Sequence, residues 1–129
     1  TAAADRQLAV VRAEQRLLAA GGVNTVDAAL FEASHGSPAR GVRLARRAWA
    51  AAPSVRSADA LGWALTRAGR PAAGLVWAHR ALRLGSRDPL FAFHAGIAAR
   101  GAERRALLRR SLSPALPPLY AQQAREALS

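Results

Sequence analysis

Cysteine, methionine and lysine are all absent from this chain of 129 residues. Without cysteine there is no disulfide, no thiolate metal site and no cysteine nucleophile. Aromatic residues make up only 5% of the chain, and β-branched residues are also few, so little in the composition favours β-sheet. No apolar run approaches the roughly 18 residues of a membrane-spanning helix, so we expect no membrane span. The missing initial methionine suggests a piece trimmed from a longer protein, and nothing in the sequence identifies a compartment.

The charge is strongly one-sided, because 19 arginines face only 8 acidic residues, for a formal charge of +11. A basic surface attracts nucleic acids or acidic proteins. Alternatively, abundant arginine and alanine with no lysine reflect a GC-rich genome, such as that of a bacterium, and we favour this compositional explanation. Alanine is also the best helix former, so the same composition predicts an all-α fold.

An internal repeat with a shift of 33 residues is the most informative feature of the sequence. Residues 36–48 (GSPARGVRLARRA) match residues 69–81 (GRPAAGLVWAHRA) at seven of 13 positions. The identities include Gly36/Gly69 and Pro38/Pro71, so alanine bias does not explain them. Glycine suits the left-handed residue that follows a helix, and proline suits the first turn of the next helix. Each repeat is therefore predicted to be a helix, a tight turn and a second helix.

The same signals predict helices throughout the chain. The expected ranges are 4–20, 25–35, 38–51, 55–68, 71–84, 89–100, 102–112 and 118–128. One face of the fourth helix carries Ala58, Leu61, Gly62 and Leu65 at helical spacing. The fifth helix has a stripe of small residues that includes Gly74 and Ala78. We expect Gly62, Gly74 and Ala78 to lie where two helices approach closely, and neighbouring units to stack into one core.

These positions resemble the tetratricopeptide repeat (TPR), a 34-residue antiparallel helix pair. The most similar copy spans 55–88, with Leu61–Gly62, Leu65, Gly69, Gly74, Ala78, Ala81 and Leu82 at signature places. Gly74 stands where the family usually has alanine, and Ser86 where it usually has proline. The resemblance covers nearly the whole chain and implies an α-solenoid, a fragment of a longer array, that binds other proteins.

The resemblance divides the chain into one domain of about three repeats with flanking helices. Residues 1–21 correspond to the second helix of a truncated repeat, 22–54 and 55–88 to full repeats, 89–113 to a shortened repeat and 114–129 to a capping helix. Gly101 follows Gly96 by five residues, whereas Gly69 follows Gly62 by seven. Arg110–Ser111–Leu112 follows Arg80–Ala81–Leu82 by only 30 residues, so about one helical turn is missing overall from the third repeat.

No pattern of catalytic or metal-binding residues stands out. His35, His79 and His94 lie far apart in the sequence, and no pair has the spacing of a helical metal site. We expect them to be exposed or hydrogen-bonded. The acidic residues form no close couple for acid–base catalysis, and no glycine-rich phosphate loop is present. The sequence therefore predicts a chain that is not an enzyme and has no cofactor or metal.

The resemblance implies that the first helices of successive repeats line a concave groove. Their sides away from the core would present an apolar floor edged by arginine, to which a peptide or helix of a partner binds. The residues predicted for this groove are Arg56, Asp59, Trp63, Arg67, Phe93, Ile97 and Arg100. They do not match the family's clamp for C-terminal carboxylates, in which asparagine and lysine recur. Packing of an adjacent repeat or a terminal helix onto the groove is the competing interpretation.

The remaining arginines cluster on the second helices, which would form the convex back. They are Arg43, Arg46, Arg47, Arg80, Arg83, Arg104, Arg105, Arg109 and Arg110. A solvated face is the simplest explanation, and binding of nucleic acid or an acidic partner there is the alternative function. No aromatic residue is expected among them as a stacking platform, and Trp49 and Trp77 are expected to pack between repeats. A third possibility is a regulatory domain of a larger protein.

Overall fold

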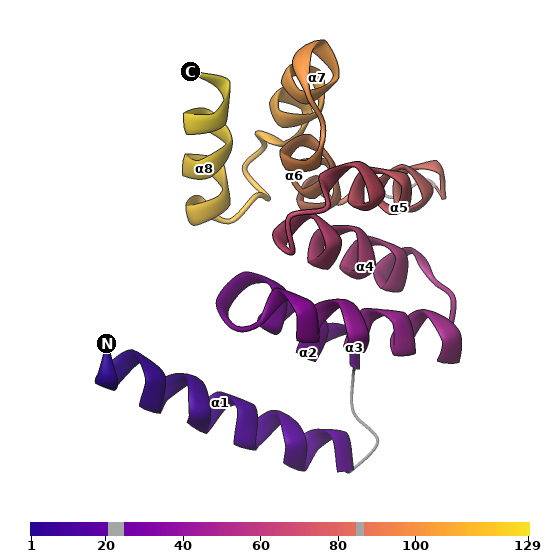
Figure 1. The fold of residues 1–129 in the computed structure, drawn as a ribbon. Helices are drawn as coiled ribbons and strands as arrows, with labels where there is room; N and C mark the ends of the chain where they lie inside the picture. The colour runs from indigo at the N-terminus through magenta and orange to yellow at the C-terminus, as the bar shows by residue number, and fades with distance from the viewer. Residues whose placement is uncertain (21–24, 85–86) are drawn as a thin grey trace.

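The computed structural model describes residues 1–20, 25–84 and 87–129, and in this part of the chain every regular element is a helix (Figure 1). The elements are α1 (Ala2–Ala20), α2 (Thr25–His35), α3 (Pro38–Ala51), α4 (Val55–Arg67), α5 (Pro71–Arg83), α6 (Pro89–Ala98), α7 (Gly101–Ser111) and α8 (Pro118–Leu128). The all-α prediction is confirmed. α6 is shorter than α4, with 10 residues against 13.

Consecutive helices pack as three pairs, α2 with α3, α4 with α5 and α6 with α7. The first helices of the pairs also contact one another, α2 with α4 and α4 with α6, and α8 continues this row by packing on α6. The result is a curved stack of helix pairs (Figure 1). α1 lies at the other end of the stack and meets only α2 among the described elements.

The ends of the helices follow from local sequence. Ser37 and Ser54 accept hydrogen bonds from backbone N–H groups in the first turns of α3 and α4, and Asp88 does the same for α6. Gly69 follows α4 with φ of 83°, the left-handed conformation that was expected. The same expectation is wrong for Gly36, whose φ is not positive. A Cβ there would lie 2.3 Å from Glu32 Oε2, so Gly36 makes room for that carboxylate instead.

Glycines let the two helices of a pair approach closely, as the sequence predicted. A Cβ on Gly62 of α4 would lie 2.8 Å from the carbonyl oxygen of Gly74 and 2.9 Å from the backbone nitrogen of Ala78, both on α5. Gly41, the counterpart of Gly74 in the preceding repeat, faces the backbone of Ala29 and Ala33 in the same way. The repeated glycine is therefore a packing requirement of the helix pair.

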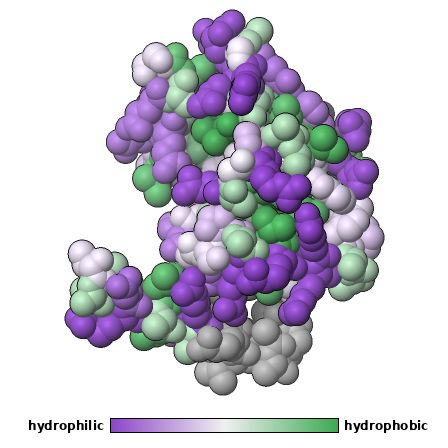
Figure 2. Space-filling model, in the orientation of Figure 1, coloured by the Kyte–Doolittle hydropathy of each residue, from purple (hydrophilic) through white to green (hydrophobic). Residues whose placement is uncertain are grey.

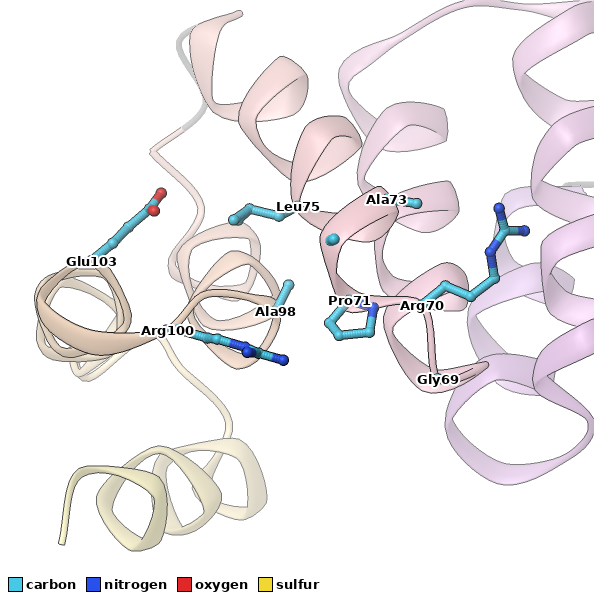
Figure 3. Close-up of a pocket in the computed structure, with 9 residues that line it drawn as sticks. Gly69, Arg70, Pro71, Ala73, Leu75, Ala98, Arg100 and Glu103 are labelled. Atoms are coloured by element: carbon cyan, nitrogen blue, oxygen red, sulfur yellow. The ribbon is translucent and has the colours of Figure 1, made fainter.

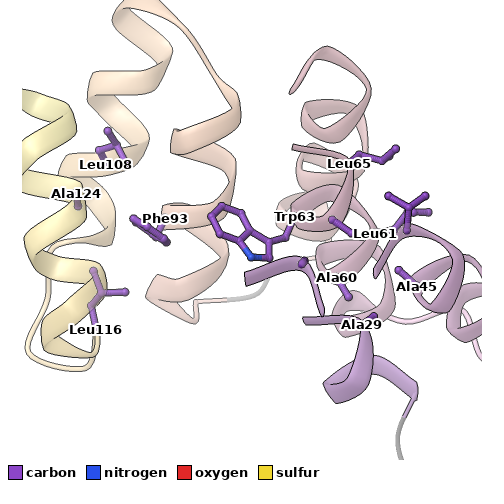
Figure 4. Close-up of a cluster of buried hydrophobic side chains, with 13 residues drawn as sticks. Ala29, Ala45, Ala60, Leu61, Trp63, Leu65, Phe93, Leu108, Leu116 and Ala124 are labelled. Atoms are coloured by element: carbon purple, nitrogen blue, oxygen red, sulfur yellow. The ribbon is translucent and has the colours of Figure 1, made fainter. Parts of the chain in front are cut away.

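The core runs through the stack between the pairs. Leu61 and Leu65 of α4 are buried toward α3, and Phe93 and Leu108 fill the space next to α8 (Figure 4). Hydrophilic side chains cover much of the face seen in Figure 2, with hydrophobic side chains scattered among them. No helix of the described residues is long and apolar enough to span a membrane.

Candidate functional site

Three hollows join into one groove on the side of the stack formed by α2, α4, α6 and α8. The central hollow has a volume of about 240 Å³ and is lined by Leu30, Phe31, Ser34, His35, Leu90, His94 and Tyr120. It shares Leu30 and Leu90 with an outer hollow of about 450 Å³, whose other lining residues are Val55, Arg56, Asp59, Leu84, Asp88 and Phe91. The groove is therefore continuous in this direction.

The central hollow also continues toward the C-terminal helix. It shares Ser34, His35 and Tyr120 with an end hollow of about 60 Å³, which Trp63, Arg67, Leu119 and Gln123 complete. Side chains from four helices thus line a single path. The path runs from Arg56 at one end, across the floor of α2 and α6, to Arg67 at the other.

A buried ion pair lies at the centre of this groove. Nδ1 of His94 is 2.9 Å and 3.0 Å from the two carboxylate oxygens of Asp59, and the side chains are only 3% and 2% exposed. The Trp63 ring stacks on the imidazole, with 4.3 Å between ring centroids. Trp63 also donates its Nε1–H to Ser34 Oγ over 2.9 Å. The cluster connects α2, α4 and α6 and fixes the orientation of His94.

The helix α8 forms one wall of the groove. Tyr120 packs on Phe93 with ring centroids 5.2 Å apart, and Ala124 is buried against the stack. Figure 4 shows Trp63 extending from α4 toward Phe93, on the side where α8 lies. The interpretation in which a terminal helix packs onto the predicted groove therefore describes this end of the molecule.

The structure places the seven predicted groove residues unevenly. Arg56, Asp59, Trp63 and Arg67 line the hollows described above. Asp59 and Trp63 are nevertheless buried, so their expected exposure as an open floor is wrong. The reason is that His94 pairs with the carboxylate and stacks on the indole.

The three predicted residues from α6 lie elsewhere. Phe93 is fully buried beneath Tyr120, and Ile97 packs partly buried against the core. Arg100 lies at the turn before α7 and lines a separate hollow of about 740 Å³ with Arg70 and Glu103 (Figure 3). The guanidinium of Arg70 points away from that of Arg100 in this view, so the two do not converge on one point.

Sequence reasoning missed the residues that α6 actually contributes to the groove, Leu90 and His94. They are spaced as i and i+4 on one face of the helix, one position away from the predicted stripe of Phe93 and Ile97. The sequence does carry a signal for them. Asp59 and His94 are oppositely chargeable residues at nearly equivalent places in successive repeats, which in a stacked array face each other.

The convex arginines follow the prediction, and one expectation about them is wrong. All nine are exposed except the partly buried Arg104. However, Trp49 and Trp77 do lie among them, with ring centroids 5.0 Å apart. The guanidinium of Arg80 covers both rings at 5.4 Å and 4.5 Å. The tryptophans therefore pack between repeats as expected, and they also give the arginine-rich back an aromatic component.

Several acidic side chains of the described residues have basic partners. Glu32 binds Arg12, Asp27 binds Arg56, and His79 contacts Glu103. No group of acidic residues and histidines in the described chain could hold a metal ion. Comparisons with protein families, curated proteins and solved structures found no match to this chain.

Proposed function

We propose that this chain is a protein-interaction scaffold that binds a segment of a partner protein along the groove. The observation that carries the proposal is the continuity of the three hollows across α2, α4, α6 and α8. Their lining combines apolar side chains with a few polar groups held in fixed positions, as binding sites commonly do. The resemblance to tetratricopeptide repeats supports the same function.

The shape of the groove favours an extended or helical segment over a small molecule. The hollows follow one another along a path and share lining residues, rather than forming a single enclosed cavity. An amphipathic helix can place apolar side chains three and four residues apart into such a path. Leu30, Phe31 and Leu90 would contact its apolar face, and Leu119, which is 55% exposed, would contact its edge.

Site-specific photo-crosslinking tests the proposal. A photoreactive amino acid replaces Leu119 in the groove or, as a matched control, Val76 on the back, which is 59% exposed. In an extract of the native organism treated with nuclease, we expect a discrete protein adduct from position 119 and none from position 76. Leu119→Asp should then weaken binding of the identified partner at least about tenfold, or about 1.4 kcal/mol. Equal adducts at both positions would contradict a groove site.

A second candidate function is supported by the cluster of Arg80, Trp49 and Trp77 on the back. Arginines next to indole rings can bind phosphates and stack on bases. Val76, Arg80 and Arg83 lie on one face of α5 at helical spacing, so the control position also reports on this surface. Adducts to nucleic acid at position 76, in extract without nuclease, with a steep loss of affinity as salt rises, would favour this alternative.

A further inference from the structure

The ion pair in the groove leaves one ring nitrogen of His94 facing the central hollow. Both hydrogen bonds of the ring are made through Nδ1, to Asp59. No fully buried side-chain nitrogen or oxygen of the described residues lacks a hydrogen-bond partner, and His94 lines the hollow. We therefore assign Nε2 to the wall of the hollow. With Asp59 accepting the hydrogen on Nδ1, Nε2 is an acceptor in the neutral ring and becomes a donor only when the ring carries a second proton. A carboxylate bound in the hollow would favour this protonated ring.

The other polar groups of the central hollow are also able to donate. Ser34 Oγ already accepts the hydrogen bond from Trp63, so its own hydrogen is available. Tyr120 contributes a phenol and His35 an imidazole. No carboxylate lines the central hollow itself. Asp59, which lines the adjoining outer hollow, is paired with His94. Hydrogen-bond donors on several sides and the absence of a carboxylate favour a ligand group that accepts hydrogen bonds, above all one with negative charge.

We propose that the central hollow binds the carboxylate of an aspartate or glutamate side chain in the partner segment, with His94 Nε2 and the Tyr120 hydroxyl as its donors. The inference rests on the proposed scaffold function and names the chemistry of its partner. Arg67 at one end of the groove suits the same acidic segment, whereas Arg56 at the other end is already paired with Asp27. Asp88 lies in the outer hollow, away from this point.

The carboxylate is that of an internal side chain and not of a chain end. The groove continues past the central hollow in both directions, since that hollow shares residues with each of its neighbours. A segment lying in the groove therefore passes over His94. A chain terminus would leave one of the two arms empty.

A fragment titration tests this assignment without the partner. Phenylacetate carries the carboxylate with a small apolar group, and phenylacetamide is its neutral analogue of nearly the same shape. We follow the ring ¹⁵N signals of His94 in the intact chain, with His79 on the other side of the molecule as an internal control. Phenylacetate should shift the His94 signals saturably, and phenylacetamide should bind at least about tenfold more weakly. Equal effects of both compounds, or shifts confined to other residues, would overturn the assignment.

Variants keep the test decisive, because His94→Gln removes a buried ion pair and can unfold the chain. Tyr120→Phe keeps the packing on Phe93 and removes only the hydroxyl, so it should weaken phenylacetate several-fold. Gln122→Ala, an exposed change on α8 outside the three hollows, should leave the affinity unchanged. Unchanged affinity in Tyr120→Phe would overturn the role of that hydroxyl.

Once the partner is crosslinked, replacing its acidic residues by amides should weaken its affinity for this chain at least about tenfold. A partner whose affinity does not change would overturn the inference and leave the scaffold function standing.

Discussion

Trp63 shows how one residue acquires a different meaning in the folded chain. Its position beside Gly62, one step from the apolar face of α4, predicts a large aromatic anchor exposed to a partner. In the structure it is only 5% exposed, because the next repeat covers it. His94 stacks on its ring, and Ser34 accepts its N–H. Trp63 is therefore a residue of the core, where its ring holds His94 in position.

This burial changes the expected effect of Trp63→Ala. The variant removes a buried indole and leaves a cavity, which costs about 3–5 kcal/mol in the free energy of unfolding. Urea denaturation followed by circular dichroism measures this loss. Val76→Ala, at an exposed site, should stay within about 0.5 kcal/mol of the parent. A Trp63→Ala chain that unfolds at the parent's urea concentration would show that the ring contributes little to the core.

At the scale of the element, the sequence was sufficient to predict the helices. Prolines at the first turn, serine or aspartate caps and glycine after a helix are local signals, and the bounds they predict agree with the structure to within about two residues. The close approach at Gly62 and Gly74 was also predictable. Glycine disfavours a helix, so glycines that recur inside helices indicate that packing requires them.

The groove was harder to predict, because it depends on register between repeats. Counting 34 residues, the length of the repeat, from Asp59 and Trp63 leads to Phe93 and Ile97. The structure pairs Asp59 with His94 instead, a separation of 35 residues. A shift of one residue rotates a helix by about 100°, enough to exchange a buried stripe for a groove-lining one. The position of α8 was equally open, since both a capping role and groove packing fitted its sequence.

The helix α1 depends on one buried carboxylate for its attachment. Arg12 donates two hydrogen bonds, of 2.7 Å and 2.9 Å, to Glu32 on α2, and the backbone N–H of Ser37 donates a third. The Glu32 side chain is 1% exposed. The hydrogen bond from Arg12 holds the pKa of Glu32 below its ordinary value, against the opposing effect of burial.

A carboxylate whose pKa is lowered by folding stabilises the folded chain above its unfolded pKa of about 4.3, and this contribution disappears as the pH falls through the folded value. Glu32→Gln removes the charge at every pH. We therefore expect the melting temperature of Glu32→Gln to lie below that of the parent at neutral pH and to converge with it in acid. Glu126→Gln, an exposed change on α8, should show little difference at any pH. A gap for Glu32→Gln that persists unchanged into acid would contradict the role of its charge.

For the whole molecule, the distribution of charge matters more than any single pair. The acidic residues that form ion pairs are paired with arginine or histidine. On the convex back, arginines outnumber acidic residues. Excess charge of one sign keeps a protein soluble and destabilises its compact state through self-repulsion. The same excess favours acidic partners on both faces, so in the proposed function specificity would have to come from the positions of the polar groups in the groove.

Self-repulsion predicts an unusual response to salt. Raising sodium chloride from about 0.1 M to about 1 M shortens the Debye length from about 10 Å to about 3 Å. The exposed ion pairs lose little, because such pairs contribute only about 0–1 kcal/mol each. We therefore expect the melting temperature to rise with sodium chloride. Sulfate is unsuitable, since it stabilises proteins by exclusion from their surface.

The triple change Arg43→Gln, Arg47→Gln and Arg83→Gln removes three exposed positive charges and should flatten the rise of the melting temperature with sodium chloride. A melting temperature that falls with salt would mean that attraction within the ion pairs outweighs repulsion among the arginines.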